Sequence, residues 1–446
     1  MKMKYIHILF GSLFLMTACS VDLDQSPPNF ASADSLTDFE GVLNAAYYYQ
    51  LASVTPLAVM AEFRSDNALM EEAPYTEFDT FTSNLTTMED QFFGPLYTAL
   101  YKSILSANNV IENSTNATQV AEARFLRGLS YFKLVKSFGA VTVNLSAAPS
   151  LTDIDILVRR PASEVYNTVI IPDLTAATTL SAVISDGRAS KLAAHALLGK
   201  VYATMGDFTN AEIQLAIVVN GAAAAGISLK SNFNEIFGAA NEAVNSEIIF
   251  ATQISASIVD EYSFGSDFWN WFVGDDSKSN LPVDPDLVAA FDTSDANGGG
   301  TDLRRAVTLS VDGTTAIKFP KDGGLGSDHD WIEIRLADVI LLYAEALNEN
   351  GTSANTVLPL LDSIRTRAGL TSLTGTLSTQ ADVRQAIANE RRLELAFEGH
   401  RWFDLVRTNT VDAELGETVN DNYHLFPIPV SEVLATGGII TQNDGY

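Results

Sequence analysis

The feature that most constrains this 446-residue chain is a helix-forming segment at residues 196–219 that is interrupted by a glycine turn. Gly199 and Tyr202 lie close together before the turn, because residues three apart are neighbours on a helix. Gly206 readily takes the left-handed backbone of a tight turn, and Ala211 is a small residue in the returning helix. Small side chains let two helices approach closely, so the segment predicts an antiparallel helical hairpin.

The same arrangement recurs, and its spacing is that of a tetratricopeptide repeat. Residues 335–348 carry an apolar helical stripe, Gly351 stands near the next turn, and residues 357–367 return. The stripe consists of Leu336, Val339, Ile340, Tyr343 and Leu347. Residues 119–138 form another amphipathic helix, which Gly139 ends. Because the repeats are unevenly spaced, they indicate a degenerate array with insertions and not a regular solenoid. We predict a mainly α fold, with a tetratricopeptide-like scaffold of helical hairpins (an α/α superhelix), an irregular loop-rich ligand-binding region and little β structure.

Composition narrows the possible partners. Hydrophobic residues make up 47% of the chain and charged residues 18%, which favours a large buried core over disorder. Lysine and arginine number 27 against 55 aspartate and glutamate residues, a net charge of −28 at pH 7. Nucleic acids are polyanions and would be repelled, so none is a predicted partner. The single cysteine, Cys19, excludes an intrachain disulfide and a cysteine zinc cluster.

The N-terminus has the pattern of an export signal. Lys2 and Lys4 precede an apolar run at residues 5–15, which is too short to span a bilayer. The small residues directly before Cys19 resemble a bacterial lipobox, with Met16 in place of the more usual leucine, and an ordinary signal with a chance cysteine is the alternative. We therefore expect a lipoprotein signal peptide at residues 1–18, lipidation at Cys19 and a lipid-anchored tether at residues 19–35, whose acidic start is like those that route lipoproteins to the outer face of the outer membrane.

The ligand-binding candidates lie in a stretch at residues 255–330 that is poor in helix signals and rich in Gly, Asp and aromatic residues. Sugar rings stack on flat aromatic surfaces, while a few placed polar groups bond the hydroxyls. The candidates are Trp269, Trp271, Phe268, Asn270 and Tyr262, together with Tyr75 and Phe78 from a second irregular stretch at residues 71–84. Trp269 and Trp271 point to the same side if the segment is extended. The alternative, with equal weight, is that these aromatic residues pin a long loop onto the helices.

Two carboxylates raise the possibility of hydrolysis. Glu394 and Glu398 are four apart and are expected on one helix, whereas glycosidase carboxylates flank a sugar from opposite sides. We interpret them as structural ion pairs with the interleaved arginines Arg391, Arg392 and Arg401, and we predict no catalytic residue.

The remaining polar features favour structure over chemistry. We expect His195 and His400 to be packed structural residues and residues 328–330 to be a solvated loop. Trp331 and Trp402 are expected in helical segments as core residues. A glycine run is flanked by oxygen ligands of the kind calcium prefers, at Asp292, Asp295, Asn297 and Asp302. Their spacing does not match an EF-hand, so calcium is a minor alternative and we predict no metal and no cofactor.

Several separate segments together resemble the SusD/RagB family of outer-membrane nutrient-binding lipoproteins. The segments are residues 93–109, 121–139 (AEARFLRGLSYFKLVKSFG), 160–174, 246–250, 335–348, 364–369, 390–407 (ERRLELAFEGHRWFDLVR) and 426–446. The resemblance implies a non-enzymatic protein that is lipid-anchored on the extracellular side of the outer membrane. It would capture oligosaccharides or polysaccharides and pass them to a SusC-like TonB-dependent barrel.

The resemblance also divides the chain. Residues 36–254 would be the N-terminal SusD-like helical region with tetratricopeptide-like repeats, and residues 255–446 the C-terminal SusD/RagB region. The latter would comprise a variable loop insertion at residues 255–330, then hallmark helices and a C-terminal tail at residues 331–446. Peptide uptake of the RagB type, a purely structural scaffold and, most weakly, a surface hydrolase are the alternatives.

Overall fold

The computed structural model describes residues 38–150, 153–182, 187–242, 245–255, 268, 270–272, 282–320 and 328–446. The predicted signal peptide, Cys19 and tether lie outside the described residues, and Phe39–Tyr446 forms one unit. Within the described residues, no helix combines the length and the hydropathy that crossing a membrane requires.

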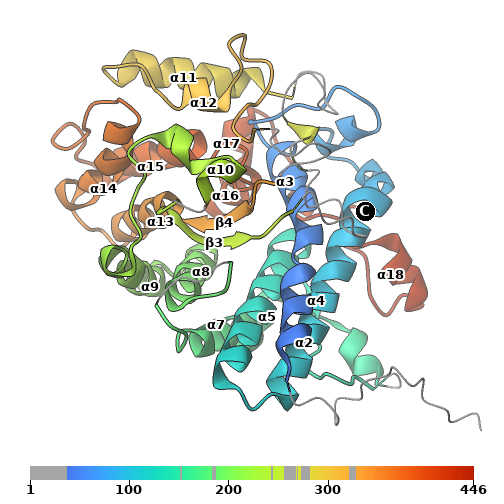
Figure 1. Cartoon of the computed structure of the whole chain (residues 1–446). Coiled ribbons are helices and arrows are strands. Elements are labelled where there is room, and N and C mark those ends of the chain that lie inside the picture. The colour runs from blue at the N-terminus through green and yellow to red at the C-terminus, as the bar shows by residue number, and fades with distance from the viewer. Residues whose placement is uncertain are drawn as a thin grey trace, which may run out of the picture. The chain divides into compact units, whose positions relative to one another are not determined.

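The unit begins with a group of helices, of which the two longest pack side by side (Figure 1). The helices of this group are α2 (Glu40–Tyr48), α3 (Val54–Glu62), α4 (Gly94–Asn113) and α5 (Ala117–Phe138). At the start of α5 the side chain of Asn116 accepts hydrogen bonds from the backbone of Thr118 and Gln119. The helix ends at Gly139, which has a φ of 70°. The helix predicted over residues 119–138 is confirmed.

The predicted hairpin is formed by α8 (Lys191–Thr204) and α9 (Phe208–Gly221). Gly206 has a φ of 75°, as the turn requires. A Cβ atom at Gly199 would lie 2.4 Å from Cγ of Leu215, so only glycine allows the two helices this close an approach. The tetratricopeptide-like spacing therefore reports a real packing constraint.

The second predicted hairpin is also present. It consists of α13 (Leu336–Glu349) and α14 (Ala354–Arg367), and Gly351 between them has a φ of 82°. The predicted stripe on α13 is buried apart from Tyr343, which is half-buried. α13 also packs against α9 and against α15 (Gln380–Glu394), so the hairpins continue from one to the next.

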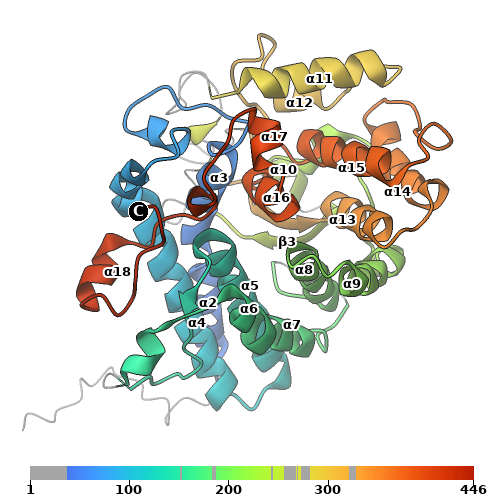
Figure 2. The same cartoon turned by 180° about the vertical axis from the view of Figure 1, so that it is seen from behind.

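Shorter helices complete the scaffold (Figures 1 and 2). They are α6 (Ala162–Val165), α7 (Ile171–Ala177), α10 (Ala239–Glu242), α11 (Pro285–Asn297), α12 (Arg305–Thr308), α16 (Arg401–Thr408), α17 (Val411–Leu415) and α18 (Val430–Ala435). The predicted fold class, mainly α with tetratricopeptide-like hairpins and little β structure, is confirmed.

The described residues contain two small antiparallel sheets. β1 (Val141–Thr142) pairs with β2 (Arg159–Arg160), and β3 (Ile248–Thr252) pairs with β4 (Trp331–Arg335). β3 overlaps residues 246–250, one of the segments that carry the family resemblance. Trp331 is a core residue as expected, but its predicted helical placement is wrong because residues 331–335 pair with β3 before α13 begins.

The expectation that residues 255–330 lack helix is wrong for α11. The side chain of Asp284 accepts a hydrogen bond from the backbone of Asp286, and Pro285 occupies the first turn. Leu287 and Phe291 are four apart and fully buried, so one face of the helix packs inward. The capping residue, the first-turn proline and the apolar pair are common helix signals. The many Gly and Asp residues around them made the segment look like a loop.

Candidate functional site

Three of the aromatic residues predicted to bind ligand are buried. Trp271 is 1% exposed, and its ring contacts Tyr75 and Phe92 at centroid distances of 5.1 and 5.2 Å. Phe268 is fully buried, and its ring centroid lies 5.1 Å from that of Phe319. Phe78 is also fully buried.

A buried ring offers no face to a sugar. The exposed platform predicted from Trp271, Phe268 and Phe78 is therefore not formed in this structure, and pinning the loop to the helices describes these three residues. Trp269 and Tyr262 lie outside the described residues, so their role stays a prediction.

The structure does bring the two predicted irregular stretches together. Ala68 pairs with Val283, and the backbone N–H of Leu69 donates to the carbonyl of Pro282 at 3.0 Å. Tyr75 is half-buried on a 3-10 helix and meets the buried Trp271 edge to face. Asn270 is also half-buried. Tyr75 and Asn270 are thus the predicted ligand residues that the described structure leaves partly accessible.

A buried arginine holds the loop that carries Tyr75. Arg64 is 1% exposed and donates to the carbonyl of Phe78 at 2.9 Å. The ring of Phe81 covers its guanidinium at 4.5 Å, and Phe81 has a φ of 48°, a conformation that non-glycine residues rarely adopt. The sequence did not single out Arg64, because nothing local links it to a loop more than ten residues later.

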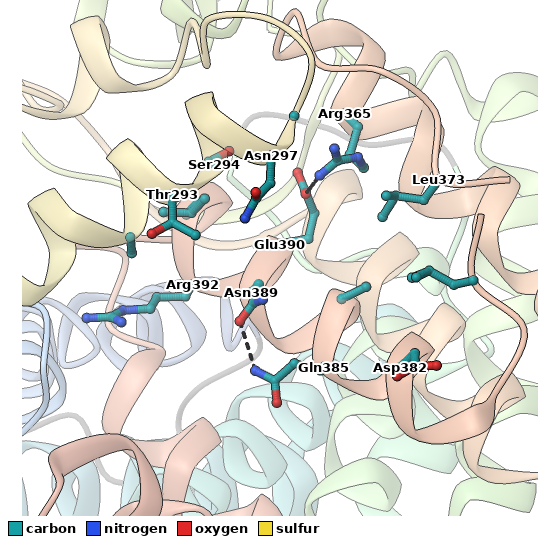
Figure 3. Close-up of a pocket in the computed structure, with 15 residues that line it drawn as sticks. Thr293, Ser294, Asn297, Arg365, Leu373, Asp382, Gln385, Asn389, Glu390 and Arg392 are labelled. Carbon is teal, nitrogen blue, oxygen red and sulfur yellow. Dashed lines mark hydrogen bonds and ion pairs between the residues drawn. The ribbon is translucent and has the colours of Figure 1, made fainter.

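A second feature, which the sequence did not predict, is a cleft of about 410 Å³ between α11 and α15 (Figure 3). Its lining is mixed: the neutral polar residues are Thr293, Ser294, Asn297, Gln385 and Asn389, the charged ones are Arg365, Asp382, Glu390 and Arg392, and the apolar ones include Leu373, Leu377 and Leu393. Asn389 accepts a hydrogen bond from Gln385 at 2.9 Å through Oδ1, which leaves its Nδ2 group available as a donor. Glu390 at the cleft is neutralised by Arg304 and Arg365, at 2.5 and 3.2 Å.

Backbone hydrogen bonds fix the walls of this cleft. The N–H of Thr371 donates to the carbonyl of Gly298 at 2.8 Å, and the N–H of Leu303 donates to Ala368 at 2.9 Å. The available signal in the sequence was a pair of polar residues four apart on each helix, Thr293 with Asn297 and Gln385 with Asn389. That signal is weak, because most exposed helix faces look alike.

The suggested calcium ligands have other roles. Asp302 pairs with Arg304 at 2.7 Å, and Asp295 accepts a 2.6 Å hydrogen bond from the backbone of Asp302. Asp292 pairs with Arg305. Throughout the described ranges, no group of three or more His, Cys, Asp or Glu side chains is placed to hold a metal ion.

The interpretation of Glu394 and Glu398 as structural ion pairs is confirmed. Both are buried, and Arg335 contacts Glu394 at 2.6 Å and Glu398 at 2.7 Å. Burial alone would raise the pKa of Glu398, but Arg335 and Lys318 hold that pKa below its usual range. An ionised carboxylate already bound by two cations is a poor proton donor or base.

The predicted helix and partners of this pair are wrong. α15 ends at Glu394, so Glu398 lies beyond the helix. The arginines next to them in sequence point elsewhere: Arg391 pairs with Asp338 at 2.9 Å, and Arg392 and Arg401 pair with Asp66 at 3.1 and 2.6 Å. The cations that bind the two glutamates come from distant segments.

The histidines also differ in part from expectation. His329 is fully buried against Phe319, at a centroid distance of 5.3 Å, so the predicted solvated loop is wrong at this residue. His195 is buried and bonds Gln214 at 2.8 Å, as a packed residue should. Burial, with Lys200 nearby, lowers the pKa of His400 to about 3, so His400 is a neutral structural residue.

The structure is a scaffold of helical hairpins. It carries two candidate ligand-binding features, the surface around Tyr75 and Asn270 and the cleft between α11 and α15. Residues 22–203 match the SusD-like family model described as starch-binding and associating with the outer membrane, and residues 292–420 match the SusD family model. The chain belongs to the SusD/RagB family. The description of the model that matches residues 22–203 is that of a binding protein and names no catalytic activity.

Known relatives match along nearly the whole chain. SusD-like protein P2 of Formosa agariphila is 26% identical, and the match covers 100% of both chains. A SusD superfamily structure from Parabacteroides distasonis is 22% identical with a TM-score of 0.77, covering 94% of this chain and 100% of that one. A laminarin-binding SusD-like protein is 27% identical with a TM-score of 0.72, covering 92% of this chain and 99% of that one.

Proposed function

We propose that this chain is a lipid-anchored protein of the outer cell surface that captures nutrient glycans and delivers them to a SusC-like TonB-dependent barrel. The observation that carries the glycan proposal is the similarity, over nine-tenths of the chain, to a laminarin-binding SusD-like protein. The outer-membrane proposal rests on the family description that matches residues 22–203 and on the lipobox-like sequence before Cys19.

The geometry suits a neutral polysaccharide. Tyr75 is half-buried, and its ring packs edge to face against that of Trp271. Asn270, the residue before Trp271, is also half-buried and adds an amide. Trp269 and Tyr262, which lie outside the described residues, stay in the proposed set of ligand contacts on the sequence prediction alone. The net charge of −28 disfavours strongly anionic glycans, because like charges repel. We therefore propose a neutral β-glucan such as laminarin as the first ligand to test.

Affinity electrophoresis of residues 20–446 tests this proposal. The gels would contain laminarin, another neutral polysaccharide, an acidic one or a sulfated one, and a peptide pool would be titrated in parallel. We expect retardation by a neutral glycan. Binding of peptides alone would replace the glycan proposal with peptide uptake, and no binding of any ligand would leave a structural scaffold.

Variants locate the site. Tyr75→Ala and Trp269→Ala should each weaken glycan binding at least tenfold without changing thermal stability. Tyr343→Ala is the matched control, because this tyrosine is half-buried on the scaffold helix α13. Equal loss of binding in the control variant would show that the effect arises from the fold.

Anchoring and partnership have separate tests. In cells, Cys19→Ser should move the protein from the detergent phase to the aqueous phase on Triton X-114 partitioning. Affinity purification of the lipidated protein from outer membranes should recover a TonB-dependent barrel. Recovery of the protein alone would contradict the proposed delivery step while leaving glycan capture intact.

A further inference from the structure

A second cavity, of about 450 Å³, lies among α5, α8, α13 and α16. It is separate from the cleft between α11 and α15 and from the surface around Tyr75 and Asn270, because its lining shares no residue with either. Cavities of this size accommodate small organic molecules.

The cavity contains a lysine without a carboxylate partner. Among the described residues, the side-chain ammonium of Lys136 makes no hydrogen bond or ion pair. Its Nζ atom lies 4.2 Å from the ring centroid of Phe403 and 5.9 Å from that of Phe132. Aromatic faces attract a cation only weakly compared with a buried carboxylate. Burial, with Lys200 nearby, lowers the pKa of Lys136 to about 7.

The neighbouring cations are all paired. Lys133 binds Glu333 at 2.5 Å, and Lys200 binds Asp338 at 3.1 Å. Arg391 and Arg407 bind the remaining carboxylates, Asp404 and Glu345.

Lys136 therefore differs from its neighbours. Of the five cationic side chains named here, it is the one without a carboxylate partner, and a bound carboxylate would favour its charged form. His400 faces the same cavity but adds no charge, because its pKa is about 3.

The rest of the lining is largely apolar. It includes Phe132, Val135, Leu342, Phe403, Val406 and Leu425. A strongly hydrated inorganic anion would lose its water against such walls, whereas an apolar body would gain from burial. One unpaired ammonium group matches one carboxylate.

We propose that this cavity binds a small organic monocarboxylate, whose carboxylate pairs with Lys136 and whose apolar body lies against the hydrophobic wall. The proposal does not depend on glycan capture, and no residue of the proposed glycan surface lines the cavity.

Isothermal titration of the folded chain with benzoate tests the proposal, with benzamide as the uncharged analogue of the same shape. We expect benzoate to bind and benzamide to bind at least tenfold more weakly. Sulfate and chloride at matched ionic strength should compete poorly. Equal binding of benzoate and benzamide, or binding of sulfate as strong as that of benzoate, would overturn the proposal.

Lys136→Met should weaken benzoate binding at least tenfold, whereas Lys136→Arg should restore most of it. Lys102→Met is the matched control, because this exposed lysine also lies over an aromatic ring, at 5.6 Å from that of Tyr49, but outside the cavity. Benzoate affinity that is unchanged in Lys136→Met would refute the assignment.

Two further measurements keep the test independent of folding and of the glycan proposal. Crystals of the wild-type chain soaked in 4-bromobenzoate should show an anomalous bromine peak in this cavity, and a peak elsewhere would contradict the proposal. Lys136→Met should retain wild-type retardation in the glycan gels, so either proposal can fail alone.

Discussion

Glu394 provides the most direct test that the carboxylates of the C-terminal segment hold the fold together. Its side chain is fully buried and is bound by Arg335 at 2.6 Å, by Arg304 at 3.2 Å and by Arg367. Glu394→Gln keeps the shape but removes the negative charge, so the surrounding arginines lose part of their compensation. Breaking a buried ion pair on one side costs about 3–5 kcal/mol, and we expect a loss of that size in the free energy of unfolding at pH 7.

The pH dependence supplies a second criterion. Burial alone would raise the pKa of Glu394, but Arg367, Arg335 and Arg304 together hold it far below its usual range. A carboxylate with a lowered folded-state pKa stabilises the protein above its unfolded pKa of about 4.3 and loses that contribution as the pH falls through the folded pKa. The stability difference between wild type and Glu394→Gln should therefore be largest near neutral pH and should shrink in acid.

Urea unfolding followed by circular dichroism measures both effects. Glu349→Gln is the matched control, because Glu349 pairs at 2.6 Å with Arg384, whose side chain is 51% exposed. Such surface pairs contribute about 0.2–1 kcal/mol. If Glu394→Gln loses less than the control, or if its deficit grows as the pH falls, the structural interpretation of this residue is wrong.

Three further variants test other parts of the argument. Gly199→Ala and Gly41→Ala each replace a helix glycine. The new Cβ meets Leu215 at 2.4 Å in the first and nothing within 4 Å in the second, so Gly199→Ala should be less stable by about 1–3 kcal/mol. Burial raises the pKa of Glu62 from 4.5 to about 7, so the contribution of this residue to stability falls as the pH rises through that window. Glu62→Gln, which does not ionise, should gain up to about 3 kcal/mol on wild type between pH 5 and pH 8. Trp271→Ala removes a buried ring and should cost about 3–5 kcal/mol in the free energy of unfolding.

Each of these has an outcome that contradicts it. Equal stability of the two alanine variants in urea unfolding would mean that the α8–α9 contact tolerates a methyl group. A constant difference between wild type and Glu62→Gln across that pH range, measured in the same way, would show that the carboxyl is already ionised at pH 5. Loss of glycan retardation in Trp271→Ala with unchanged stability would return Trp271 to the ligand site.

Local signals in the sequence were enough to predict the scaffold of helical hairpins. Gly199 and Gly206 are glycines for reasons that act within a single hairpin, namely a close helix contact and a left-handed turn. The periodic apolar stripe on residues 336–347 similarly indicated a packed helix, although the structure also buries its other faces, at Asp338 and Leu342 for example. Such features repeat over short distances, so spacing alone reveals them.

The identity of ion-pair partners and the exposure of aromatic residues could not be obtained in this way. Glu398 meets Arg335 and Lys318 because the strand β4 and a loop converge on the end of α15, and no spacing in the sequence encodes that meeting. The cleft between α11 and α15 likewise forms only because two helices nearly a hundred residues apart in sequence bring Asn297 and Asn389 to one site.

The sequence by itself thus determined the helical hairpins, the predicted exported and acidic character of the chain and its family likeness, because these follow from composition and from short-range order. Only the tertiary structure decided that Trp271 and Phe268 are anchors, that the arginines next to Glu394 bind other acids, and that Lys136 faces a cavity in which it pairs with no carboxylate. Burial and charge pairing are properties of surfaces that meet in space, and the chain brings those surfaces together only when it folds.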